Sequence, residues 1–121
     1  MTFDPDTKEI AINRGSRGTI KLTNSEGKFK VGDKIKFSIV ERRHYENVVF
    51  QKEYIVTEES SVFYLTLTSE DTKIGDFINR EKKYWYEIEY NNEVTLIGHD
   101  KDGEKEFILY PEAGEKNGGD N

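Results

Sequence analysis

Residues 83–90 read Lys-Tyr-Trp-Tyr-Glu-Ile-Glu-Tyr, and their alternation most constrains what this chain can fold into. Side chains at every second position of a β-strand share one face of the sheet. One face therefore carries three tyrosines and an isoleucine, and the other carries two carboxylates. This is the pattern of a half-buried strand, and it requires other strands to supply a matching apolar layer.

Seven further segments have the composition of short strands, and turn-forming residues separate most of them. They are residues 9–12, 19–23, 34–41, 48–56, 62–67, 93–97 and 104–110. Residues 42–47 are polar and predict a loop, and the partial alternation of 48–56 leaves the register of that strand open. The pair Asn91-Asn92 predicts a two-residue hairpin, because asparagine tolerates a positive φ.

Thr68 or Ser69 precedes Glu70-Asp71, which predicts one short helical turn capped by a hydroxyl and ending at Gly75. Together these segments predict an all-β fold, an antiparallel β-sandwich of seven to eight strands with one short helical turn. A closed barrel is the alternative. We expect Tyr86 and Ile88 to face the core together with Ile35, Phe37 and Ile39.

The length of 121 residues and the 34% hydrophobic content suit a single domain with one modest core. We expect this domain to cover residues 1–110. The composition of residues 111–121, dominated by Glu, Lys, Gly, Asn and Asp, predicts a disordered C-terminal tail that can be removed without loss of stability.

The net charge of −6 disfavours binding to nucleic acid, whose phosphates it would repel. The absence of cysteine excludes a disulfide framework and any thiolate metal site. The first residues carry no basic and apolar leader, and no apolar run approaches the length of a membrane span. We expect neither a secreted precursor nor a membrane protein.

Candidate catalytic and metal-binding residues are few. His44 and His99 are the only histidines, lie far apart, and are interpreted as surface residues. Residues 100–104 begin like a calcium loop but lack its twelve-residue spacing, so we interpret them as a charged turn. The basic groups at 14–17 and 42–44 are interpreted as solvated loops. We predict no catalytic residue, no metal site and no cofactor.

Trp85 is the candidate partner contact. The alternation places it on the face opposite Tyr84 and Tyr86. There it could cover the second face of the sheet, be shielded by a loop or sit in an interface, and we favour packing in the core over stacking on a ligand.

Four blocks of sequence, in this order and spacing, resemble the immunoglobulin-like N-terminal domain of phage baseplate upper proteins. They are residues 12–20 (Ile-Asn-Arg-Gly-Ser followed by Gly-Thr-Ile), 29–39, 65–72 and 84–90. The resemblance spans about residues 9–110. It implies an immunoglobulin-like sandwich with a non-enzymatic assembly role, located in the virion tail, or in the bacterial cytoplasm when expressed from a prophage.

The partners implied by the resemblance are other phage tail or baseplate proteins, with a homo-oligomer as a further candidate. The main rival, from the aromatic content, is a carbohydrate-binding β-sandwich module, which requires coplanar exposed aromatic rings. A hydrolase is a third and weaker hypothesis, because the sequence carries neither a pair of converging carboxylates nor a histidine pair.

Overall fold

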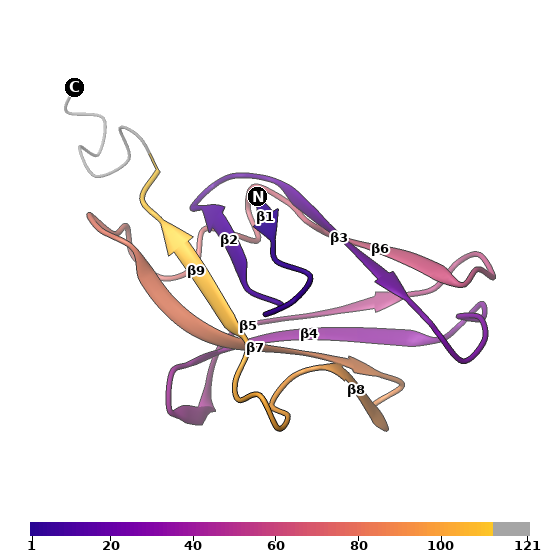
Figure 1. Cartoon of the computed structure of the whole chain (residues 1–121). Helices are drawn as coiled ribbons and strands as arrows, with labels where there is room; N and C mark the ends of the chain where they lie inside the picture. Colours follow the sequence, from indigo (N-terminus) through magenta and orange to yellow (C-terminus); the bar gives the residue numbers. More distant parts are fainter. Residues whose placement is uncertain (113–121) are drawn as a thin grey trace.

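The structure is a computed structural model that describes residues 1–112. Within this range the chain forms nine strands and no helix (Figure 1). They are β1 (Thr2–Phe3), β2 (Ile10–Asn13), β3 (Gly18–Thr23), β4 (Lys34–Glu41), β5 (His44–Ile55), β6 (Val62–Leu67), β7 (Lys82–Tyr90), β8 (Val94–Ile97) and β9 (Glu106–Tyr110).

The strands form two sheets that pack as a sandwich, which confirms the predicted fold class (Figure 1). The larger sheet has seven strands, six of them in the order β1-β2-β9-β7-β4-β5. The seventh, β8, pairs with the second half of β7, whereas β9 pairs with the first half. The smaller sheet is the pair β3-β6. Two details correct the prediction: β1 is an additional strand, and β2 runs parallel to β9, so the sheets are not wholly antiparallel.

The predicted core residues of β4 and β7 are buried, with exposed fractions between 0 and 3%. They do not face each other across the sandwich, however. The two strands are hydrogen-bonded neighbours in the large sheet, where Phe37 pairs with Ile88 and Ile39 with Tyr86. The opposing layer comes from the small sheet, through the buried residues Ile20, Leu22, Leu65 and Leu67.

Phe37 lies at the centre of this core. Its ring is 5.6 Å from that of Tyr86, 6.1 Å from that of Phe50 and 6.2 Å from that of Phe107. These rings come from β7, β5 and β9, so a single side chain of β4 touches three other strands of the large sheet. Tilted and edge-on aromatic pairs of this kind add to the stabilisation that comes from buried area.

The strand β5 begins at His44, so the prediction of a loop over 42–47 is wrong beyond Arg43. Arg43 adopts a φ of 67° and forms the turn with Arg42. The pairing of β4 with β5 shifts register on both sides of Val40, so β5 carries extra unpaired residues there. One extra residue, Val49, lies within residues 48–56. It explains why that segment alternates only in part, because an inserted residue reverses the face of those that follow it.

Residues 68–73 form a single hydrogen-bonded turn at the predicted position, in which the Thr72 N–H donates to the Thr68 carbonyl at 3.3 Å and the Lys73 N–H donates to the Glu70 carbonyl at 3.2 Å. The Asp71 N–H donates to the Thr68 hydroxyl at 3.1 Å, as the cap predicted, and the Thr68 N–H donates to the Asp71 carboxylate at 2.9 Å. No helical run follows this cap.

A hairpin is present at the predicted place, and both asparagines have a positive φ, of 51° and 57°. Its loop has three residues instead of the predicted two, because Tyr90 pairs with Val94 and residues 91–93 lie between the strands.

Most of the predicted tail, residues 113–121, lies outside the described residues. The first two residues of the tail do contact the domain. The Asn13 side chain donates to the Pro111 carbonyl at 3.1 Å, and the Glu112 carboxylate lies so close to Gly15 that a Cβ at that position would overlap it.

Replacing Phe37 with alanine should lower the free energy of unfolding by about 3–5 kcal/mol, because it leaves a cavity where four strands meet. Urea denaturation measures this loss. The matched control is Phe77→Ala, whose ring is 50% exposed and whose removal should cost less than about 1 kcal/mol. Equal losses in the two variants would place Phe37 outside the core.

Candidate functional site

Apolar side chains gather at one end of the outer face of the large sheet, the face turned away from β3 and β6. We call Val40, Tyr45, Val48 and Trp85 the Trp85 patch. Trp85 stands directly opposite Val40 in the β4-β7 pairing, and its ring lies 5.4 Å from that of Tyr45. Val40 is only 7% exposed, although its side chain points outward, whereas Tyr45 and Val48 are about half exposed.

Trp85 is half-buried and lies outside the hydrophobic core, so the favoured interpretation of core packing is wrong. It covers the second face of the sheet, one of the alternatives left open by the alternation. Tyr45 was not singled out in the sequence because residues 42–47 were interpreted as loop. The extension of β5 back to His44 brings this tyrosine over the sheet beside Trp85.

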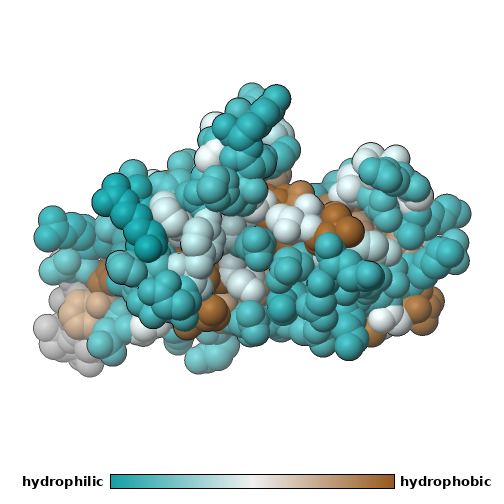
Figure 2. Space-filling model, turned by 90° about the horizontal axis from the view of Figure 1, so that it is seen from below, coloured by the Kyte–Doolittle hydropathy of each residue, from teal (hydrophilic) through white to brown (hydrophobic). Residues whose placement is uncertain are grey.

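The remainder of the outer face is polar. Lys36 Nζ lies 3.4 Å from the Glu89 carboxylate, and the Gln51 side chain donates to the Ser38 hydroxyl at 3.0 Å. Burial, together with the neighbouring Glu89 carboxylate, raises the pKa of Glu87 above its ordinary value. Figure 2 views the molecule from below Figure 1 and shows white and brown residues gathered among a largely hydrophilic surface.

A depression of about 220 Å³ adjoins the patch and is bounded by residues of β4, β5 and β7. Its walls include the apolar side chains of Val40, Tyr45 and Val48 and the carboxylates of Glu87 and Glu89. It is too small for a drug-sized ligand, which typically occupies about 300–1,000 Å³. Its size and mixed lining suit a single side chain of a partner.

The interpretation of both histidines as surface residues is confirmed. Each imidazole is 60% exposed and pairs with a nearby glutamate, His44 with Glu46 at 3.4 Å and His99 with Glu104 at 3.0 Å. The charged turn at 100–104 is also confirmed: the Asp100 carboxylate accepts from the Asp102 N–H at 2.9 Å and from Lys105 Nζ at 2.7 Å. Among residues 1–112, no three His, Asp or Glu side chains are grouped so as to hold a metal ion.

Arg14 was interpreted as part of a solvated basic loop, and this is wrong. Its side chain is 7% exposed, and its guanidinium donates to the carbonyls of Ile74 and Gly75. Thr72, whose hydroxyl donates to the Ser16 carbonyl at 2.8 Å, ties the same two segments together. Arg14 therefore positions the connection between β6 and β7, a role that no local sequence pattern signals.

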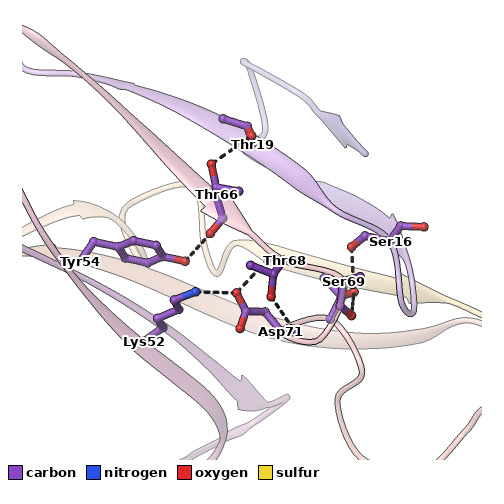
Figure 3. Close-up of polar contacts among 9 residues, drawn as sticks. Ser16, Thr19, Lys52, Tyr54, Thr66, Thr68, Ser69 and Asp71 are labelled. Carbon is purple, nitrogen blue, oxygen red and sulfur yellow. Dashed lines mark hydrogen bonds and ion pairs between the residues drawn. The ribbon is translucent and has the colours of Figure 1, made fainter.

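A second group of polar side chains joins the two sheets along the flank formed by β5 and β6 (Figure 3). We call Lys52, Tyr54, Thr68 and Asp71 the inter-sheet polar cluster. The Tyr54 hydroxyl, on β5, donates to the Thr66 carbonyl, on β6, at 2.7 Å. Lys52 Nζ lies 2.8 Å from the Asp71 carboxylate. Each of these groups has a hydrogen-bond partner, so the cluster ties the two sheets together along this flank.

No match to this chain was found among protein-family models, curated proteins or solved structures. The part of the chain that the structure describes contains no helix with the length and apolarity of a bilayer span.

The stability contributed by Asp71 should depend on pH. Burial alone would raise the pKa of Asp71, but hydrogen bonds from Lys52 and Thr68 outweigh it and hold the pKa below its ordinary value. Because the folded-state pKa is the lower one, the contribution is complete above the unfolded pKa. It fades as the pH falls through the folded-state value.

Asp71→Asn should therefore lower the free energy of unfolding by about 1.5–3 kcal/mol at pH 7, the usual range for hydrogen bonds to a charged group. Urea denaturation at steps from pH 7 to pH 3 should show the difference from wild type shrinking below about pH 4. Asp76→Asn, at an exposed position of the same connection, is the control. If the difference in free energy of unfolding between Asp71→Asn and wild type does not change with pH, the ionised Asp71 carboxylate does not supply this stability.

Proposed function

We propose that the chain is a non-enzymatic docking module of a phage or prophage tail baseplate, which binds other tail proteins through the Trp85 patch. The observation that carries docking is the placement of a tryptophan and a tyrosine in contact on the outer face, next to a depression of side-chain size. Large aromatic side chains surrounded by polar groups are the usual anchors of protein interfaces.

The strand order supports the immunoglobulin-like part of the proposal. The run β9-β7-β4-β5 corresponds to the G-F-C-C′ order of a variable-type immunoglobulin sheet, and β3-β6 corresponds to the B-E pair of the opposing sheet. The baseplate assignment rests on the resemblance of residues 9–110 to baseplate upper proteins.

The geometry of the aromatic pair favours protein over carbohydrate as the ligand. The planes of the Tyr45 and Trp85 rings are inclined at 41°, whereas a flat platform for sugar rings requires coplanar aromatics. The tilted pair instead presents an uneven surface that protein side chains can fill.

Trp85→Ala should weaken binding to the partner by about 2 kcal/mol or more, because it removes the central anchor of the interface. The purified chain, mixed with products of the tail genes beside its own, should co-elute with one of them in size-exclusion chromatography. Calorimetric titration of that pair then measures the loss. Tyr64→Ala, which removes a 62% exposed aromatic ring from β6, should leave affinity unchanged.

Unchanged affinity in Trp85→Ala, with a lower free energy of unfolding, would contradict the assignment of this patch. A shift of tryptophan fluorescence with glycans, without co-elution with any tail protein, would favour the carbohydrate-binding module. If the purified chain self-associates and Trp85→Ala dissociates it, the partner at this patch is a second copy.

A further inference from the structure

An open groove of about 870 Å³ lies between strand β3 of the small sheet and strand β8 of the large sheet. Its lining includes three consecutive residues of each strand, Lys21–Thr23 and Thr95–Ile97. Consecutive side chains of a strand point to opposite faces, so a space that touches three in a row meets the strand along its edge. We call this space the β3–β8 groove.

The groove exists because the two sheets are unequal in width. Two strands face seven, and the inter-sheet polar cluster holds the small sheet against the β5 side of the large one. Across residues 1–112, β3 pairs only with β6 and β8 pairs only with β7. Both strands therefore leave an unpaired edge on the flank where the groove lies.

The hydrogen-bond register shows which backbone groups of β3 line that edge. The Asn24 N–H donates to the Ser61 carbonyl at 2.8 Å, one step beyond the pair Thr23↔Val62. Bonded and non-bonded pairs alternate along an antiparallel ladder. The N–H and C=O groups of Lys21 and Thr23 therefore point away from β6, toward the groove, as free donors and acceptors for an added strand.

The lining combines apolar and basic side chains. Leu22 is buried in the core below, and Tyr90 and Leu96 are partly buried beside it. Four lysines border the groove (Lys8, Lys21, Lys28 and Lys30) against one carboxylate, that of Glu26. The groove is therefore locally positive on a chain whose net charge is −6. Lys21, Lys28 and Lys30 are exposed and form no ion pair with a described carboxylate.

We propose that the β3–β8 groove binds an acidic, extended segment of a protein partner as an additional strand along β3. Main-chain hydrogen bonds to Lys21 and Thr23 supply a register, and the surrounding lysines select carboxylates. Lysine on an exposed edge opposes pairing with the same edge of a second copy. A long nucleic acid would meet the repulsion of the acidic remainder of the chain.

The test uses the full chain and a fluorescein-labelled peptide of eight residues in which glutamate and valine alternate. Fluorescence anisotropy measures binding at low salt and at 0.5 M NaCl, where screening should weaken it. Amide hydrogen exchange measured by NMR should slow at Lys21 and Thr23 in the complex, because their N–H groups become hydrogen-bonded. A peptide with lysine in place of glutamate, and one with proline in place of valine, should not bind.

The double variant Lys21→Glu, Lys28→Glu should bind the acidic peptide roughly tenfold more weakly or worse, because attraction becomes repulsion at two positions. Its control is Lys73→Glu, Lys83→Glu, which makes the same charge change at exposed positions outside the groove and should bind like wild type. Melting curves establish that both variants fold. Trp85→Ala should also bind the acidic peptide like wild type. The experiment therefore tests the groove independently of the Trp85 patch.

Three results would overturn the proposal. The first is no binding of the acidic peptide up to about 1 mM, a concentration that detects even weak association. The second is binding that persists in Lys21→Glu, Lys28→Glu. The third is equally tight binding of a single-stranded oligonucleotide, since the groove would then respond to charge alone and not to a strand.

Discussion

The pairing of β4 with β7 is the constraint on which the rest of the structure depends. It places Phe37 beside Ile88 and Ile39 beside Tyr86, so that the two strands together present one apolar surface. Phe37 then joins this pair to β5 and β9 through Phe50 and Phe107. The small sheet needs only to cover this surface, which it does with four buried aliphatic side chains. A single layer of such strands would leave its apolar face in water, and the free energy of burial drives the second layer onto it.

The covering layer is narrower than the layer it covers, and this inequality creates the β3–β8 groove. On the β5–β6 flank, the Tyr54 hydroxyl and the Lys52–Asp71 ion pair bridge β5 to β6 and to the turn that follows it. On the opposite flank, β3 stands apart from β8, and the open edge becomes a groove. The outer face of the large sheet has no covering layer at all. Trp85 and Tyr45 cover Val40 there and leave apolar area exposed at one end of an otherwise charged face.

The sequence predicts what depends on local periodicity and misses what depends on distant contacts. The alternation of 34–41 and 83–90 correctly assigns Ile35, Phe37 and Ile88 to the core, because a period of two fixes the buried face. It cannot reveal that the two strands are neighbours in one sheet. The bulges beside Val40 hide the start of β5, and with it the tyrosine that contacts Trp85. In the sequence Arg14 looks like any basic loop residue. Its burial depends on the carbonyls of Ile74 and Gly75, which lie about sixty positions later in the chain.

The two proposed surfaces lie at different places on the domain, and β7 contributes to both. Trp85 and Tyr90 lie on the same strand, and five residues of extended chain span roughly 16 Å. Trp85 is turned to the outer face, whereas Tyr90 contacts Phe29 on the side of the groove, with ring centres 5.4 Å apart. The groove is basic and the patch is apolar with adjoining carboxylates, so the same partner segment does not suit both. Since β7 contributes to each, this central strand fixes the distance and the angle between two different contacts. Under the two proposals, β7 would therefore set the relative positions of the two partner segments.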